Sequence, residues 1–253
     1  MAYQYDTETI SDVSAPFDMM TTLFAELHGY QDASPSSAAM NMAIDEALLE
    51  AAVVPSVRFY RWRSPALSFG YFGKFAEVVS YAGERDVVRR WTGGGIVLHG
   101  DDLTYSIVIP ARDQAFAEPP MVIYEHIHRG LCTALNGTGE RAFVVGGIEP
   151  LPITLAKQAT MRASTYNCFA KPVRADVMID GRKVAGAAQR RTRWGLLQQG
   201  SIQNISIHNE LAQRFAGTLS ADCRWREITE KLLQRARELA RQKYGADSWL
   251  RKR

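Results

Sequence analysis

Apolar positions early in the chain recur at helical spacing. In the segment AAMNMAIDEALLEAA, apolar residues fall three or four positions apart, at Met40, Ala43, Ile44, Ala47, Leu48 and Ala51. Because three to four residues complete one helical turn, this spacing predicts an amphipathic helix. Ser36-Ser37 provides a serine cap in front of the helix, and Pro55 ends it.

Runs rich in aromatic and β-branched residues follow this helix, and such runs predict strands. VRFYRW (57–62) and ALSFGYF (66–72) are separated by Arg63-Ser64-Pro65, which favours a pair of strands. VVRRW and GIVLH flank three glycines, and LTYSIVI (103–109) alternates up to Pro110. Later, VRADVMI and KVAGAAQ flank Asp180-Gly181-Arg182, a turn signal that predicts a hairpin, and WGLLQQGSI (194–202) predicts a further strand.

Helical patterns also occur between and after the strands. MVIYEHIHRGLCTALNG (121–137) predicts a helix that Asn136-Gly137 stops, and WREITEKLLQRARELARQKYG predicts a final amphipathic helix with a basic outer face. Near the N-terminus, PFDMMTTLFAELHGY has room for a short helix before the linker-like QDASPSS. This order lacks regular strand–helix alternation, so it predicts an α+β fold with a mixed or antiparallel sheet packed with helices.

Length and composition indicate one sizeable core. The chain has 253 residues, of which 46% are hydrophobic and 23% charged. We expect residues 1–35 to form an N-terminal extension and residues 36–253 to form a single domain. The formal net charge of +3 allows an acidic partner but does not indicate nucleic acid.

Other features bound the setting of the protein. No apolar run approaches the ~18 residues that a membrane span needs, and the N-terminus has acids where a secretory signal has a basic start. Cys132, Cys168 and Cys223 are far apart and form no CxxC pair. These features predict a reduced, cytoplasmic protein with no membrane partner.

The stretch RRWTGGGIVLHGDDLTYS (89–106) is the most unusual part of the chain. Consecutive glycines let the backbone approach a ligand closely, and their N–H groups can surround an anion. Arg89 and Arg90 precede the glycines, and arginine suits phosphate or carboxylate. The stretch matches neither a P-loop nor GxGxxG. A glycine-rich hairpin with surface arginines explains the same residues, and this stretch alone does not decide between the two.

A second candidate is Lys183, which follows the turn glycine Gly181 by two residues. Small residues come next, at Ala185, Gly186, Ala187 and Ala188. Small side chains inside a strand often mark the close approach of a ligand or another backbone. A lysine over such a floor can hold a carbonyl or phosphate oxygen, and the plainer alternative is a surface lysine in a hairpin.

Cys168, in TYNCFAKP, is a candidate nucleophile if a nearby cation favours its thiolate. The alternative, a buried small hydrophobe, is what we expect for Cys132 and Cys223. No metal spacing is present among His28, His126, His128 and His208. Only His99, at the edge of the glycine stretch, is a candidate site histidine.

Taken together, the motifs resemble the lipoate–biotin ligase superfamily, specifically its lipoate-protein ligase and octanoyltransferase branch. The motifs, in order, are Asn41-x-x-x-Asp45-Glu46, RRxTGGGxVxH at 89–99, LTYS at 103–106, Cys168-Phe169, GRKVAGxAQRR at 181–191 and LLQQGS at 196–201. The resemblance runs from about residue 38 to residue 202. It implies that 36–253 is an α+β catalytic domain whose glycine-rich loop wraps an acyl chain.

The resemblance also implies roles for single residues. The acyl site would be lined by Arg90, Gly93, Gly94 and Gly95, with His99 at its edge. Lys183 would bind the acyl carbonyl, and Gly186 and Ala188 would form the floor beside it. Three positions depart from the family pattern: Gln199 stands where a histidine is common, Gly100 stands where an acid often follows the histidine, and Trp91 is a large residue at the entrance of the loop.

Two reactions are known on this scaffold. A lipoate ligase uses ATP and Mg to form lipoyl-AMP, whereas an octanoyltransferase uses no cofactor and takes the acyl group from acyl carrier protein or an acylated protein through a cysteine thioester. The motif NCF before GRKVAGxAQ, together with LTYS, resembles the cysteine-dependent octanoyltransferases. We therefore expect Cys168 and Lys183 to be catalytic, with the ligase as an alternative and a non-catalytic lipoyl-binding subunit as a second alternative.

The expected partners follow from the same resemblance. The donor would be acyl carrier protein, and the acceptor would be a lysine of a lipoyl domain in the glycine-cleavage H protein or in the E2 subunit of a 2-oxoacid dehydrogenase. Neither nucleic acid nor a membrane is expected, and no metal site is indicated.

Overall fold

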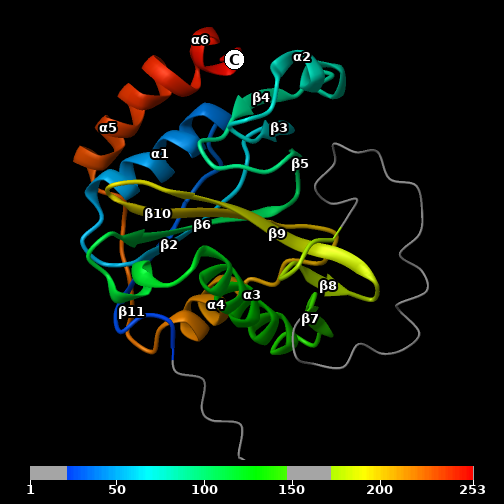
Figure 1. Cartoon of the computed structure of the whole chain (residues 1–253), viewed down its shortest axis with the longest axis vertical. Helices are drawn as coiled ribbons and strands as arrows, with labels where there is room; N and C mark the ends of the chain where they lie inside the picture. The colour runs from blue at the N-terminus through cyan, green and yellow to red at the C-terminus, as the bar shows by residue number, and fades with distance from the viewer. Residues whose placement is uncertain (1–21, 147–171, 253) are drawn as a thin grey trace, which may run out of the picture.

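The computed structural model describes residues 22–146 and 172–252, and it arranges them as two sheets with helices on both faces of the larger sheet (Figure 1). Figure 1 shows α1 and α5 on one face of that sheet and α3 and α4 on the other. The helices are α1 (Ala38–Ala51), α2 (Phe75–Val78), α3 (Pro120–Asn136), α4 (Leu211–Leu219), α5 (Glu230–Leu239) and α6 (Asp247–Leu250).

The larger sheet has the strand order β11-β1-β2-β6-β10-β9-β8-β7. Its strands are β1 (Leu27–Gln31), β2 (Ser56–Tyr60), β6 (Leu103–Pro110), β7 (Ala142–Val144), β8 (Val177–Ile179), β9 (Arg182–Arg191), β10 (Gly195–Ile202) and β11 (Cys223–Trp225). Strand β1 pairs in parallel with β2 and β11, and the remaining neighbours are antiparallel. The mixed sheet confirms the predicted α+β class.

A smaller sheet has the order β4-β3-β5, with β3 at Ala66–Phe69, β4 at Asp86–Arg89 and β5 at Ile96–His99. The predicted pairing of 57–62 with 66–72 is therefore wrong, because β2 and β3 belong to different sheets. The chain leaves the larger sheet after Tyr60, and Asp86 N donates to Pro65 O, which aligns β3 with β4 instead. The glycines do not form a hairpin either, since β3 lies between β4 and β5.

Helix α1 begins where the sequence predicts. The hydroxyl of Ser37 accepts a hydrogen bond from the N–H of Met40, which is the capping arrangement expected for a serine N-cap. The helix ends at Ala51, ahead of Pro55. It buries Asn41, Asp45 and Glu46 besides its apolar residues, so this helix faces a polar region as well as a core.

The two ends of the described chain differ from their expected helices. Leu27–Gln31 is strand β1, so a helix that includes LHGY is wrong. At the other end, Cys223–Trp225 forms β11, and α5 begins only at Glu230, where Thr229 provides the N-cap. A π-helical turn, Ala240–Tyr244, extends α5. In both places the segment adds a strand to the larger sheet. Strand β1 pairs with β2, and β11 pairs with β1.

The hairpin between β8 and β9 confirms the turn prediction. Asp180 and Gly181 both have positive φ, at 47° and 74°. A two-residue turn of this kind favours glycine, because a Cβ is strained at positive φ. The turn leads directly into the strand that carries Lys183.

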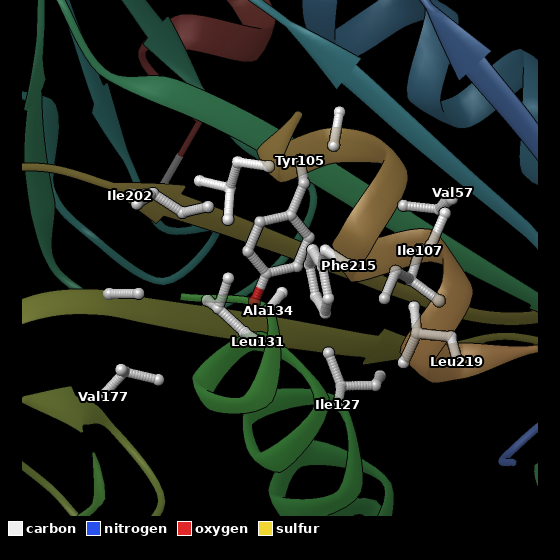
Figure 2. Close-up of a cluster of buried hydrophobic side chains, with 14 of the residues drawn as sticks. Val57, Tyr105, Ile107, Ile127, Leu131, Ala134, Val177, Ile202, Phe215 and Leu219 are labelled. Carbon is white, nitrogen blue, oxygen red and sulfur yellow. The ribbon is translucent and has the colours of Figure 1, made fainter. Parts of the chain in front are cut away.

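The main core lies between the larger sheet and the helices α3 and α4. Figure 2 shows Tyr105 and Phe215 together with Ile127 and Leu131, side chains that come from β6, α4 and α3. All four are fully buried. A second cluster of buried apolar side chains lies on the opposite face under α1 and α5, and a third lies in the smaller sheet.

Among the described residues, no helix is long and apolar enough to cross a membrane.

Candidate functional site

A cavity of about 370 Å³ lies between the smaller sheet and the larger one. Its lining comes from α1, from the strands β2, β3, β5, β6, β9 and β10, and from the glycine-rich loop between β4 and β5. Apolar side chains that line it are Met42, Trp62, Val97, Val173, Ala187 and Ala188, and charged ones are Arg90, Asp176 and Lys183. The cavity can therefore hold a mainly apolar molecule with a polar end.

The glycine-rich loop is held over the cavity by Arg90. The guanidinium of Arg90 donates to the carbonyls of Gly93 and Gly95, at 3.0 and 2.9 Å, and to the hydroxyl of Ser68 at 2.6 Å. The close approach of the backbones explains why glycine is needed here. A Cβ on Gly70 would lie 2.0 Å from the carbonyl oxygen of Gly94, and Gly94 itself has a φ of 85°.

Arg89, in contrast, does not line the cavity, and it is not a surface arginine. It is 1% exposed, and its guanidinium donates only to backbone carbonyls in the bonds that the structure resolves. These carbonyls belong to two segments, Tyr71 and Gly73 in one and Trp249, Leu250 and Lys252 in the other. Arg89 thus ties the C-terminal segment to the loop after β3.

Lys183 is buried and held in place by an ion pair. Its Nζ lies 2.8 Å from Oδ2 of Asp176, and the Asp176 side chain is fully buried. Asp176 also accepts a hydrogen bond from the hydroxyl of Tyr124 at 2.9 Å and one from Val173 N at 2.7 Å. The lysine bends back over Gly186, where a Cβ would lie 2.7 Å from its Nζ. The missing side chain at Gly186 leaves the room that the ammonium occupies.

A buried histidine, His128, makes a hydrogen bond to the turn before Asp176. Ala175 has a φ of 68°, a conformation that costs energy for a residue with a Cβ. Its carbonyl accepts from Nδ1 of His128, and Nε2 of His128 accepts from the hydroxyl of Tyr105. Burial lowers the pKa of His128 to about 4, so its imidazole is neutral and makes both bonds.

His99 lies at the other end of a hydrogen-bonded chain in the cavity wall. Its ring bonds to Ser68 Oγ at 2.6 Å and to Asp102 Oδ2 at 2.8 Å, and it stacks on Trp62 with centroids 3.9 Å apart. Burial lowers the pKa of His99 despite the hydrogen bond to Asp102, and Arg90 adds to the effect. A neutral imidazole therefore donates from Nδ1 to Asp102 and accepts the Ser68 proton at Nε2. The inserted Gly100 leaves Asp102 within reach of the ring, and Gly100 N donates to that carboxylate.

The wall under α1 is also polar. Gln199 lines the cavity, donates to Asp45 at 2.7 Å and accepts from the hydroxyl of Thr92 at 2.8 Å. Asp45 pairs in turn with the fully buried Arg58, at 2.7 Å. The amide that stands in the place of a family histidine thus connects helix α1 to the glycine-rich loop.

Most of the residues predicted for the site surround this one cavity. Its lining includes Arg90, Gly94, Gly95, His99, Lys183, Gly186 and Ala188. Gly93 is absent from the lining and contributes only a carbonyl to Arg90. Cys168 lies outside the described residues. Cys132 is buried, as expected, and Cys223 is partly buried at the start of β11.

Sequence reasoning missed Asp176 and Trp62. Both line the cavity, and both are buried. A signal for Asp176 was present, because an acid inside the apolar run VRADVMI is rarely buried without a partner. Nothing in the sequence near Trp62 indicated its stacking on His99. In residues 22–146 and 172–252, no group of histidines, cysteines and acids could hold a metal ion.

The fold and the site define an α+β domain with a mainly apolar cavity next to a buried lysine–aspartate pair. Residues 37–236 match the family described as the lipoyl protein ligase A/B catalytic domain. An octanoyltransferase LipM from Oceanobacillus iheyensis is 37% identical over 194 residues, which cover 74% of this chain and 67% of that relative. Another, from Brevibacillus brevis, is 30% identical and covers 84% and 94%. The chain therefore belongs to the lipoyl protein ligase A/B catalytic domain family.

A solved structure shares the fold. The crystal structure of lipoate-protein ligase A bound with ATP has a TM-score of 0.66 to this chain, with 22% identity, and the match covers 90% of this chain and 98% of the other. At this identity the likeness concerns the fold.

Proposed function

We propose that this protein transfers an octanoyl or lipoyl group to a lysine of a lipoyl-acceptor protein. The observation that carries the proposal is family membership with relatives named octanoyltransferase LipM, at 30% to 37% identity. The cavity supports it, since an apolar lining ends at a buried cation. An octanoyl chain that leaves water there would gain roughly 5 kcal/mol from about six methylenes at ~0.8 kcal/mol each.

Lys183 is assigned the role of binding the oxygen of the reacting acyl carbonyl. A fixed cation is most useful where negative charge develops on the carbonyl oxygen during acyl transfer. Asp176 and Gly186 give the ammonium one position, the first by an ion pair of 2.8 Å and the second by leaving space. Backbone N–H groups of Gly94 and Gly95 are assigned to the same site, with Arg90 holding their loop in place. His99 and Ala188 belong to the walls around the chain.

Cys168 is assigned as the nucleophile. Its thiolate attacks the carbonyl of an acyl thioester, the bond to the donor sulfur breaks, and the donor leaves as a thiolate. The amine of the acceptor lysine then attacks the acyl-cysteine. An amide forms, the amine loses a proton, and the thiolate of Cys168 returns. Because an amide is more stable than a thioester, this sequence runs downhill without ATP.

The remaining parts of the proposal concern partners and setting. The donor is acyl carrier protein, and the acceptor is a lipoyl domain of the glycine-cleavage H protein or of a 2-oxoacid dehydrogenase E2. The reaction takes place in the cytoplasm and uses no cofactor. The odd, widely spaced cysteines support a reducing setting.

The test is intact mass spectrometry of the purified protein after incubation with octanoyl carrier protein and no ATP. We expect an adduct with the mass of one octanoyl group that hydroxylamine removes and that Cys168→Ala does not form. The matched control is Cys132→Ala, which should keep the adduct.

Two results would overturn parts of this proposal. Full transfer by Cys168→Ala would remove the thioester step. Absence of an adduct, together with lipoyl-AMP formation from lipoate and ATP, would make the protein an ATP-dependent ligase.

A further inference from the structure

A second hollow lies on the outer side of the smaller sheet, and we call it the outer groove. It has a volume of about 560 Å³ and is lined by Tyr71, Phe72, Gly73, Lys74, Phe75, Ala76, Arg89, Arg251 and Lys252. The residues come from the loop after β3, from α2 and from the C-terminal segment after α6. Figure 1 shows the C-terminus beside α2 and β4, so two segments distant in sequence form this groove.

The outer groove combines an exposed aromatic residue with a rim of cations. Phe72 is 84% exposed, which is the largest exposed fraction among the large hydrophobic residues that the structure describes. Lys74 and Arg251 expose 77% and 61% of their side chains, and Lys252 is also exposed. None of the lining residues is acidic. Exposed apolar surface with a polar rim is typical of a protein-interaction site.

Two acids pair with this rim and offset only part of the charge of its four cations, Lys74, Arg89, Arg251 and Lys252. Glu77 lies 3.5 Å from Lys74, and Asp247 lies 3.7 Å from Arg251. Both are loose pairs between exposed side chains on the same helical segment, and such pairs hold each other weakly. The hydrogen bond from Lys252 lowers the pKa of Tyr71, and charges on Lys252, Arg190 and Lys243 act in the same direction. The groove therefore presents a positive potential to a partner.

The groove is preformed, because Arg89 joins its two halves. The guanidinium donates to Tyr71 O and Gly73 O at 2.7 Å on one side, and to Leu250 O and Lys252 O at 2.9 and 2.7 Å on the other. Trp249 Nε1 donates back to Arg89 O at 3.0 Å. A surface fixed in this way loses little conformational freedom when a partner binds.

The loop after β3, which lines the outer groove, also contacts the glycine-rich loop of the acyl cavity. Tyr71 N donates to Thr92 O at 2.8 Å, and Gly70 packs against the backbone of Gly94. Arg90, the residue after Arg89, faces the cavity and holds Gly93 and Gly95. The loop that lines the outer groove thus packs against the glycine-rich loop that lines the acyl cavity.

We propose that the outer groove is the docking site for an acidic helix of the carrier protein that donates the acyl group. An amphipathic helix fits an apolar groove through its apolar side, and acidic residues beside that side meet Lys74, Arg251 and Lys252. The donor is the better occupant than the acceptor domain because the donor must deliver the whole acyl chain into the cavity under the glycine-rich loop, whereas the acceptor lysine needs only to reach the carbonyl end of that chain. This inference rests on the proposed transfer from a protein-bound thioester.

The test compares a protein donor with a small one. Initial rates would be measured with octanoyl carrier protein and with the octanoyl thioester of N-acetylcysteamine, for the full chain and for Lys74→Glu/Arg251→Glu. We expect the KM for the carrier to rise at least tenfold with kcat unchanged, and the rates with the small thioester to stay the same. Phe72→Ser should raise the same KM several-fold, and high salt should reduce the difference between wild type and the charge variant.

A matched control is Arg214→Glu/Arg224→Glu. It makes the same change of charge and also removes two cations from exposed ion pairs, but on α4 and β11. Its KM for the carrier should stay within about twofold of wild type, because long-range steering alone is screened at physiological salt. An equal rise in both double variants would show that net charge and not the groove matters.

Other results would overturn the assignment in distinct ways. Equal losses with both donors would make the outer groove a structural element of the acyl site. A rise in the KM of the acceptor, with that of the carrier unchanged, would assign the groove to the acceptor domain. Sedimentation with anionic vesicles that the charge variant abolishes, with carrier kinetics unchanged, would assign it to a lipid surface.

The groove can also be tested when the proposed function fails. If wild type transfers from neither donor, calorimetry of the carrier with wild type and with the charge variant still measures docking. If the charge variant binds the carrier at least tenfold more weakly than wild type, the result would support the groove as the docking site but would not support the transfer reaction. Equal binding by both proteins, or none to wild type, would overturn the groove.

Discussion

The two faces of the larger sheet both carry buried apolar clusters, yet the face under α1 also buries a network of charged groups. Strand β6 shows the difference within one segment. Tyr105, Ile107 and Ile109 point into the apolar core with α3 and α4, whereas Thr104 and Ser106 point to the face under α1 and bond to Asp102 and Asp45. Every residue of β6 is buried, so burial does not distinguish the faces. Bonding to buried carboxylates does, because the hydroxyl of Tyr105 on the other face bonds to His128 and Gln198 instead.

The comparison shows where this fold places its stability and where it places its chemistry. On the face with α3 and α4, stability comes from the hydrophobic effect. This effect is non-directional, so it tolerates many arrangements of the side chains. The face under α1 must satisfy buried charges, and Arg58 alone bonds to Asp32, Asn41 and Asp45. Such a network fixes side chains in single positions, and the acyl cavity lies against it.

The largest expected effect is on the apolar face. Phe215→Ala should lower the free energy of unfolding by about 4 kcal/mol, because Phe215 is fully buried and packs edge-on against Phe59 and Tyr105. Urea unfolding measures this change, with Phe215→Leu as the conservative control. Acyl transfer per folded molecule should be unchanged. A large loss of activity in the folded fraction would show that the two faces are not separate.

A somewhat smaller effect is expected on the polar face. Asp45→Asn should lower the free energy of unfolding by about 3 kcal/mol, since Arg58 is fully buried and would keep only Asp32 as a carboxylate partner. Unlike Phe215→Ala, this change should also raise the KM for the acyl donor, because Asp45 holds Gln199 at the cavity.

The control for this variant is Asp247→Asn, which removes a carboxylate from an exposed pair. It should change stability by less than about 0.5 kcal/mol. If Asp45→Asn alters stability but not the KM, the network supports the fold without shaping the site.

The smallest of the three effects depends on pH and concerns His128, a titratable group on the apolar face. Its folded pKa of about 4 lies below the ordinary value of 6.5 because burial disfavours the charged ring. The unfolded chain therefore binds more protons between pH 6.5 and pH 4, and stability is lost as the pH falls through that window. By pH 5 the loss should be about 2 kcal/mol relative to pH 7.

Unfolding measured at pH 7 and pH 5 tests this expectation. His128→Gln should show a smaller decrease between the two pH values than wild type, by about 2 kcal/mol. His126→Gln, an exposed neighbour on α3, should retain the wild-type decrease. An identical pH dependence in all three proteins would place the acid sensitivity elsewhere, with His99 on the polar face as the next group to vary.

Elements with strong local signals were predictable. The periodicity and the serine cap gave α1, and Asp180-Gly181 gave the hairpin before Lys183. The pairing of strands was not predictable in the same way. Strands β2 and β3 are adjacent in sequence but lie in different sheets, because the tertiary fold places β6 beside β2 and places β4 and β5 beside β3.

For the candidate site too, some residues could be predicted from the sequence and others could not. Its motifs predicted Arg90, Gly94, Gly95, Lys183 and Gly186 as site residues, and the structure places them around one cavity. The resemblance placed Arg90 at the site but gave no role to Arg89, because neighbouring residues of an extended segment point to opposite sides and the sequence does not say what lies on the far side. The partners of Arg89 in the C-terminal segment are 160 to 163 residues away.

The sequence by itself determined the class of fold, the position of the glycine-rich loop and the lysine strand, because these depend on local periodicity, turn chemistry and motif order. The tertiary structure decided which charges are buried and how they are paired. The ion pair of Lys183 with Asp176, the stacking of His99 on Trp62 and the outer groove all join segments far apart in the chain. Contacts of this kind depend on how the elements pack, and local sequence does not specify packing.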